Sequence, residues 1–204
     1  MDDARLALVR VSAALSPCST ADLRVALRAA VTDAAPEQVE EVLLQGYLFA
    51  GYPAALNGFR LWREASGRPA PRPSEDDAEV WAERGADVCR RVYAGQYERL
   101  RANVAALHPD MERWMLNEGY GKVLGRPGLD LATRELCIAA LLASLDAEPQ
   151  LYAHLRGAIN AGASEEDVEQ ALREAGRGMS PERARIAREV WGRVRERRRE
   201  RTGS

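Results

Sequence analysis

The stretch Leu131-Ala-Thr-Arg-Glu-Leu-Cys-Ile-Ala-Ala-Leu-Leu-Ala-Ser-Leu145 decides the fold class of this chain. It is rich in good helix formers, lacks Gly and Pro, and follows Asp130, a residue type that favours helix starts. Apolar residues recur at helical spacing along most of the chain, whereas alternating runs of Val, Ile and Thr are missing. The sequence therefore predicts an all-α protein.

Apolar spacing and start signals outline a succession of helices. We expect them at 3–16, 19–32, 36–50, 53–65, 77–106, 108–123, 130–145, 148–161, 164–176 and 180–201. The Pro-rich segment 65–77 has no apolar anchor, which is typical of an extended linker. Residues 1–64 and 78–204 share an order of long helix, short helix, small-residue turn and acidic helix start. This shared order favours two related helical repeats.

Composition and charge exclude several classes of protein. Of the 204 residues, 46% are hydrophobic and 29% charged, as in ordinary globular proteins. The net charge of −2 argues against nucleic acid as the main ligand, because such proteins normally carry a basic excess. Three widely spaced cysteines indicate a reducing compartment rather than a disulfide scaffold. With no long apolar run and an acidic Met-Asp-Asp start, we expect a cytoplasmic protein with no membrane partner.

Two polar residues stand where helices should be apolar. Glu135 has apolar neighbours three, four and seven positions on, and His154 likewise lies on the apolar side of the helix expected at 148–161. A carboxyl group among aliphatic side chains can hold or pass a proton near neutrality. An imidazole within reach adds a second titrating group, so the pair has the minimum needed for general acid–base catalysis.

Spacing alone leaves an alternative open for both residues. Glu135 can instead face solvent or pair with Arg134 or Arg156, and His154 can be a core residue. In the first repeat the corresponding positions hold Arg5 and Ala26, so the acid and the imidazole are both missing there. This difference agrees with one working site and one lost site, and also with chance.

Several segments carry a family resemblance. They are residues 118–136 with the turn Arg126-Pro-Gly-Leu-Asp130, Gln150 with His154, the run Asn160-Ala-Gly-Ala-Ser-Glu-Glu166, and residues 40–55 ending in Gly-Tyr-Pro-Ala-Ala. Together they resemble the carboxymuconolactone decarboxylase family. The resemblance implies the all-α fold of alkylhydroperoxidase-D-like proteins. It also implies homo-oligomeric rings in which neighbouring chains complete the active sites.

The family contains two chemistries, and the cysteine positions distinguish them. Its peroxidase members combine a Glu with Cys-x-x-Cys and a following His. Glu135 and His154 match the acid and the imidazole, but Ala147 and Gln150 stand at the cysteine positions. A disulfide relay cannot run without two thiols. Cys18, Cys89 and Cys137 are expected to be small core residues.

The resemblance therefore implies the decarboxylase branch, whose substrate is a small lactone bearing carboxylates. Arg126 and Arg134 flank the turn and are candidate anchors for a carboxylate. Tyr120 is a candidate for orienting the lactone, and Gln150 is assigned to the same substrate site. For Arg134 a salt bridge or helix cap is an equally open alternative. No cofactor is expected, and His108 lies in no metal-ligand pattern.

The sequence thus favours an acid–base lyase acting on a small carboxylated lactone or related acid. The alternatives are an alkylhydroperoxidase-like or peroxiredoxin-like antioxidant protein and a non-catalytic oligomeric family member. The second repeat lacks its own copy of the 40–55 segment. We expect residues 40–62 to pack on it, within the chain or from a neighbour, and their remaining apolar surface to drive homo-oligomerisation. The arginine-rich run 193–201 indicates a solvated helix end.

Overall fold

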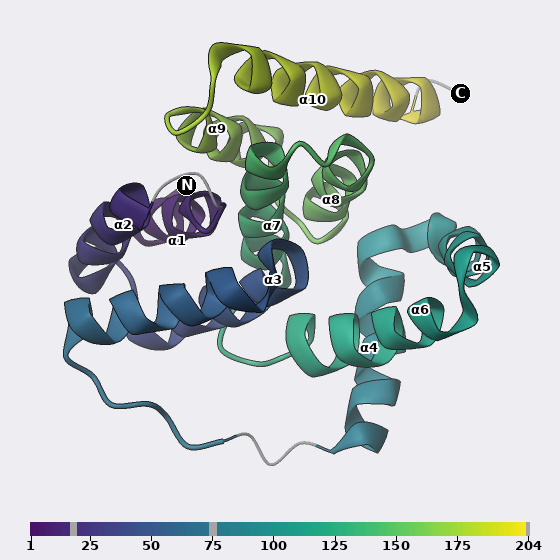
Figure 1. Cartoon of the computed structure of the whole chain (residues 1–204). Helices are drawn as coiled ribbons and strands as arrows, with labels where there is room; N and C mark the ends of the chain where they lie inside the picture. The colour runs from purple at the N-terminus through teal and green to yellow at the C-terminus, as the bar shows by residue number, and fades with distance from the viewer. Residues whose placement is uncertain (17–19, 74–76, 203–204) are drawn as a thin grey trace.

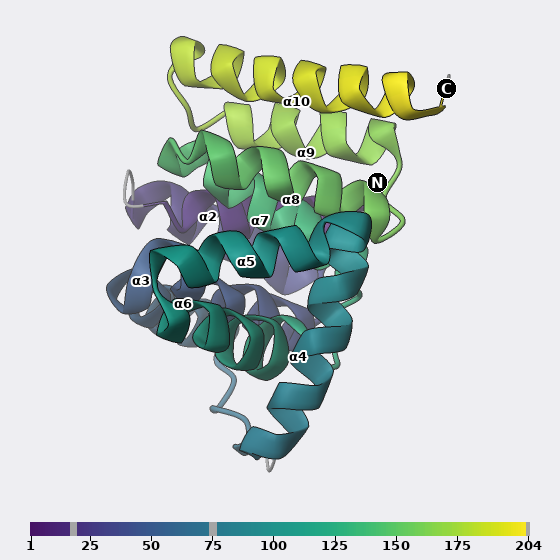
Figure 2. The same cartoon turned by 90° about the vertical axis from the view of Figure 1, so that its right-hand side faces the viewer.

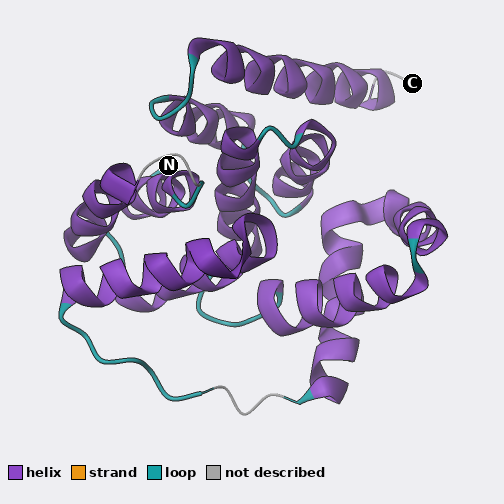
Figure 3. Ribbon diagram, viewed as in Figure 1, coloured by secondary structure: helices purple, strands orange, loops and turns teal. Residues whose placement is uncertain are grey.

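The computed structural model describes residues 1–16, 20–73 and 77–202, and these ranges contain helices and loops but no strand (Figure 1, Figure 3). The predicted all-α fold is confirmed. The elements are α1 (Asp3–Ala14), α2 (Thr20–Asp33), α3 (Pro36–Ser66), α4 (Ala78–Tyr93), the 3₁₀ turn η1 (Ala94–Gln96), α5 (Tyr97–Leu107), α6 (Pro109–Trp114), the π-helix η2 (Met115–Leu124), α7 (Leu131–Leu145), α8 (Glu148–Asn160), α9 (Glu165–Gly176) and α10 (Pro181–Thr202).

Helix α7 lies at the centre of the molecule. Every residue from Ala132 to Ala143 is buried, and α1, α3, α8 and α9 pack around this helix (Figure 1). The Asp130 side chain caps the start of α7 by accepting hydrogen bonds from the backbone N–H and the hydroxyl group of Thr133, at 2.9 and 2.7 Å. A helix covered on all sides must bury its polar residues too. Arg134 and Glu135 therefore need partners in the interior.

The helices before residue 67 and those after residue 77 share one hydrophobic core. Helix α1 packs on α7 and α9, and the Ser12 hydroxyl group donates a 2.7 Å hydrogen bond to the Cys137 carbonyl oxygen inside that contact. Residues 67–73 form the described part of the expected linker and carry no helix, while 74–76 lie outside the described ranges. The division into a 1–64 repeat and a 78–204 repeat stays a prediction.

One expected helix boundary agrees with the structure, and one expected helix is divided. The chain breaks at Gly51, whose φ of 83° suits glycine, and this break separates the two helices expected at 36–50 and 53–65. The single helix expected at 77–106 is wrong. Ala94 has a φ of 48° there, so α4 and α5 meet at a sharp corner (Figure 2). Alanine is the best helix former, so the residue type gave no signal of this turn.

The segment expected as one helix at 108–123 is a short α-helix followed by a π-helix. Helix α4 crosses this π-helix at very close range. A Cβ atom on Gly85 would lie 2.0 Å from the Leu116 carbonyl oxygen, and one on Gly121 would lie 1.9 Å from the Trp81 carbonyl oxygen. Glycine at both crossing points lets the two backbones touch. None of the described helices is long and apolar enough to cross a membrane.

Candidate active site

Glu135 and His154 meet in the interior of the molecule. Glu135 comes from the first turns of α7 and is 0% exposed, while His154 comes from the middle of α8 and is 6% exposed. The Glu135 Oε2 and His154 Nδ1 atoms are 2.8 Å apart, which is a short, charge-assisted hydrogen-bond distance. The two unusual polar residues on apolar helix faces are therefore brought together.

Gly157 makes this meeting possible. A Cβ atom at this position of α8 would lie 2.4 Å from Glu135 Oε2 and 2.7 Å from Val92 Cγ1. Any side chain there would displace the Glu135 carboxylate and the Val92 side chain, or move α8 away from them. Sequence reasoning missed Gly157. Its only signal is a glycine in the middle of a helix, which costs stability unless close packing requires it.

The second carboxylate oxygen of Glu135 is buried and has no hydrogen-bond partner among the described residues. Buried polar atoms without partners are rare and often mark functional sites. Burial raises the pKa of Cys89 to about 12, and the negative charge of Glu135 adds to the effect. Burial likewise raises the pKa of Tyr93 to about 12, again with a contribution from Glu135. These groups remain protonated and neutral beside the carboxylate near neutral pH.

A ring from the first part of the chain covers the imidazole. The Phe49 ring stands edge-on to His154, with ring centroids 5.4 Å apart and an interplanar angle of 89°. Phe49 belongs to α3 and lies just before the break at Gly51. The 40–62 segment therefore reaches the α7–α8 pair within the same chain at this residue.

A second buried ionic cluster ties α3 to the start of α7. Glu41 Oε2 accepts a 2.7 Å hydrogen bond from Arg134 Nη2, and Glu41 Oε1 accepts one of 3.0 Å from Arg126 Nε. Arg134 also donates to the Gln45 side-chain oxygen at 3.3 Å, and its side chain is 1% exposed. Burial lowers the pKa of Arg134, and the hydrogen bond and charge of Glu41 oppose this effect.

These contacts favour the salt-bridge alternative for Arg134. The Arg126 side chain is 26% exposed, so part of it still faces solvent. Sequence reasoning missed Glu41. The available signal was a pair of polar residues, Glu41 and Gln45, four positions apart on an otherwise apolar helix face.

Comparison with known proteins finds a family match over part of the chain. Residues 109–184 match the model of the carboxymuconolactone decarboxylase family, and this range contains both Glu135 and His154. The matched range is less than half of the chain and includes the whole of the α7–α8 pair.

Three curated proteins are similar to this chain. It is 30% identical over 141 residues to Peroxisomal protein 2 of Schizosaccharomyces pombe, a match covering 66% of the chain and 65% of that protein. It is 28% identical over 89 residues to 4-carboxymuconolactone decarboxylase of Acinetobacter baylyi, covering 43% and 66%. Peroxisomal protein 2 of Saccharomyces cerevisiae is 27% identical over 159 residues, covering 63% and 56%. Each match thus spans less than two thirds of the relative's own length.

The two remaining site residues expected in this chain, Tyr120 and Gln150, lie in different surroundings. Tyr120, on η2, is buried and forms a hydrogen bond with Tyr93, and the two rings are edge-on with centroids 6.1 Å apart. Burial raises the pKa of Tyr120, and the charges of Tyr93 and Glu135 raise it further. Gln150 is exposed, one helical turn before His154. The fold therefore buries Tyr120 against Tyr93, where the charge of Glu135 reaches it, and leaves Gln150 at the surface.

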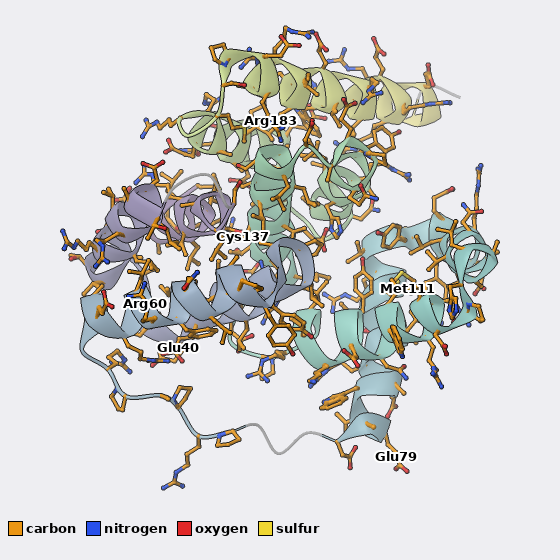
Figure 4. The ribbon with its side chains drawn as sticks, viewed as in Figure 1. Glu40, Arg60, Glu79, Met111, Cys137 and Arg183 are labelled. Carbon is orange, nitrogen blue, oxygen red and sulfur yellow. The ribbon has the colours of Figure 1, made fainter. Side chains whose placement is uncertain are left out.

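The two cysteines of this chain that the structure describes are buried thiols. Cys89 and Cys137 are both 0% exposed, and Cys137 lies in the interior on α7 (Figure 4). Burial raises the pKa of Cys137 to about 12. Cys18 lies outside the described residues. Within the described ranges no group of three or more His, Cys, Asp or Glu side chains is placed to hold a metal ion.

Proposed function

We propose that this protein is a lyase that removes carbon dioxide from a small carboxylated lactone or related acid by acid–base catalysis. The observation that carries the proposal is the buried 2.8 Å contact between Glu135 Oε2 and His154 Nδ1. The resemblance to a relative named 4-carboxymuconolactone decarboxylase supports the substrate class. The names of the two yeast relatives do not state a reaction.

The pair has a clear division of roles in such a reaction. The Glu135 carboxylate holds Nδ1 of the imidazole through the 2.8 Å contact and so fixes the orientation of the His154 ring. The remaining ring nitrogen, Nε2, is then the atom that gives a proton to the substrate. The bond between the substrate carbon and its carboxylate breaks, carbon dioxide leaves, and the electron pair stays on the lactone skeleton. The proton from Nε2 completes the product, and water restores the proton to His154.

The neighbouring groups support this role. Tyr93 and Tyr120 stay neutral near pH 7 because their pKa values are raised, so they add hydroxyl groups without adding negative charge. Phe49 limits the access of water to the imidazole from one side. Both arginines predicted to anchor a carboxylate pair with Glu41, but we retain Arg126, because its side chain is 26% exposed whereas that of Arg134 is 1% exposed.

An assay with 4-carboxymuconolactone tests the proposal. Wild-type protein is expected to release carbon dioxide, and Glu135→Gln and His154→Asn are each expected to lower kcat by about a hundredfold or more. Arg188→Gln is the matched control, because Arg188 is exposed on α10, away from the pair. Circular dichroism checks that each variant is folded. Absence of turnover by the wild type, or equal turnover by Glu135→Gln, would show that the proposal is wrong.

The alternatives have less support. A thiol-dependent hydroperoxidase needs two reactive thiols, whereas Ala147 and Gln150 occupy the expected positions and Cys89 and Cys137 have strongly raised pKa values. Peroxide consumption that is abolished by thiol alkylation would favour this alternative. A non-catalytic oligomeric member would tolerate substitution of both Glu135 and His154 without loss of any activity.

We also propose that the protein is a cytoplasmic homo-oligomer. The apolar side chains that remain exposed on α3 support self-association. The cytoplasmic location rests on composition alone, and the yeast relatives bear the name of a different compartment. Imaging of the tagged protein in its native cell tests the location.

A further inference from the structure

A hollow of about 390 Å³ opens between α5, α8 and α10. Figure 2 shows these three helices on the side of the molecule that faces the viewer. Tyr152, Arg156 and Ile159 line the hollow from α8. Tyr152 and Arg156 each stand two positions from His154 and so point about 200° away from it around the helix. Ile159 lies two turns after Tyr152 and shares that face. The hollow is therefore distinct from the Glu135–His154 pair.

The lining of the hollow has a strong positive excess. Four arginines face it, Arg99 from α5, Arg156 from α8, and Arg197 and Arg198 from α10, against the single carboxylate of Glu200 among the described lining residues. The α10 wall is part of the arginine-rich run that the sequence suggested was simply a solvated helix end.

Internal ion pairs do not account for all of this charge. Arg198 Nη1 is 2.9 Å from Glu165 Oε1, and Arg197 Nη1 is 3.9 Å from Glu200 Oε2. Arg99 and Arg156 have no carboxylate partner in the described part of the chain, and the Arg156 guanidinium group instead lies 5.9 Å from the centre of the Tyr152 ring. Cations that converge without counter-charges repel one another and raise the local affinity for anions.

The charge is also polarised along the groove. A second hollow, of about 530 Å³, shares Tyr152, Arg197 and Glu200 with the first. It is also lined by the carboxylates of Glu148 and Glu196 and by Arg193, which pairs with Glu148 at 3.1 Å, so carboxylates outnumber arginines there. An anion that enters the groove is therefore favoured at the α5 end and repelled at the other. This gradient gives a bound anion one preferred position.

We propose that the hollow between α5, α8 and α10 binds a small organic anion that carries at least two negative charges. Arginine guanidinium groups bind phosphate and carboxylate groups through paired hydrogen bonds, so Arg99 and Arg156 hold the charged end. Tyr152 and Ile159 contact the apolar part of the ligand. The volume lies within the range of small-molecule pockets. This site is independent of the proposed lyase activity.

Calorimetric titration with two probes tests the site and distinguishes the sources of the charge. Inorganic pyrophosphate stands for a phosphate ester and citrate for a polycarboxylate, each titrated at matched ionic strength in chloride. At least one probe is expected to bind saturably to the full chain. The probe that binds more tightly identifies the chemical class.

Variants locate the binding. The double variant Arg99→Gln/Arg156→Gln is expected to weaken the affinity by about tenfold or more. Arg188→Gln is the matched control, because it removes an exposed arginine from α10 that does not line the hollow. It is expected to bind the probe as tightly as the wild type does. The single variant Arg99→Gln changes only an exposed side chain on α5 and provides a second test if the double variant does not fold.

Several results would overturn the proposal. These are no saturable binding of either probe, unchanged affinity in folded variants of the hollow, and an equal loss in Arg188→Gln, which would indicate diffuse surface charge. His154→Asn separates this proposal from the lyase proposal. Loss of probe binding in that variant would place the anion at the Glu135–His154 pair instead and would also contradict the proposal.

Discussion

Single residues control how closely the helices of the candidate site approach one another. Gly157 allows the backbone of α8 to lie against the Glu135 carboxylate, and His154 reaches that carboxylate from one turn earlier on the same helix. Because this approach depends on the missing side chain of Gly157, even a change to alanine is expected to disturb the site.

Gly157→Ala is expected to lower both stability and activity. Its Cβ atom would lie 2.4 Å from Glu135 Oε2, so the buried carboxylate or the helix must shift, at a cost of about 1–3 kcal/mol in the free energy of unfolding. Gly192→Ala is the control, because a Cβ atom there meets nothing within 4 Å and alanine favours the exposed helix. Urea unfolding measures both variants. Equal stability of Gly157→Ala and wild type would contradict the close packing.

The buried thiol of Cys137 predicts a loss of stability in alkali. Burial raises its pKa from 9.0 to about 12 in the folded protein, so the unfolded chain releases this proton first. The stability that the buried, protonated thiol contributes is complete below pH 9. It is lost progressively as the pH rises towards 12. The full difference corresponds to about 4 kcal/mol.

Urea unfolding at a series of alkaline pH values measures this effect. Cys137→Ala is expected to lose less stability than the wild type over the same pH range, because one of the ionising groups is gone. Cys89 and Tyr93 remain in both proteins and set a common background. Parallel stability curves for the two proteins would exclude Cys137 as a contributor.

At the scale of elements, one carboxylate fastens α3 to α7. The Glu41 carboxylate accepts hydrogen bonds from Arg126, just before α7, and from Arg134, in its first turn. The Arg134 side chain is almost fully buried. A buried charge that loses its partner is far more costly than an exposed one. The contact therefore fixes the helix that carries Phe49 against the helix that carries Glu135.

Glu41→Gln is expected to destabilise the protein by about 2–4 kcal/mol, because Arg134 keeps its charge without a buried carboxylate. Glu37→Gln is the matched control on the same helix. It breaks a pair with Arg68 whose side chains are both exposed, so the expected change is about 0.5 kcal/mol or less. Thermal unfolding compares the two variants. Equal losses of stability in the two variants would mean that the buried pair of Glu41 and Arg134 stabilises the protein no more than the exposed pair of Glu37 and Arg68 does.

The same scale shows how far sequence reasoning reaches. The α7 and α8 helices were predictable because the apolar spacing of both and the capping residue of α7 act locally, and so was the break at Gly51. The corner at Ala94 and the π-helix depend on tertiary packing, since neither has a residue type that requires it. Glu135 and His154 were identifiable as polar residues on apolar faces. Glu41 and Gly157 act through neighbours distant in sequence, which spacing does not reveal.

At the scale of the whole molecule, apolar side chains remain exposed in the middle of α3. Tyr52 is 65% exposed and Leu56 is 64% exposed, directly after the break at Gly51. Neighbouring exposed apolar residues of this size favour association. They are therefore the part of the 40–62 segment that remains available to a second copy of the chain.

Light scattering at micromolar concentration is expected to give a mass well above the 22.5 kDa of one chain. The double variant Tyr52→Ser/Leu56→Ser is expected to reduce that mass, because it removes the exposed apolar surface of α3. Leu107→Ser, an exposed apolar residue at the end of α5, is the control. A wild-type mass near 22.5 kDa would contradict self-association.

The edge-on contact between Phe49 and His154 has an evolutionary consequence. The ring that covers the imidazole is encoded far upstream of the residues proposed to do the chemistry, on the other side of the Pro-rich segment. Selection for turnover at α7 and α8 therefore also constrains a position in α3. Lineages that replace His154 lose the reason to keep an aromatic ring at Phe49, so the two positions should change together rather than independently.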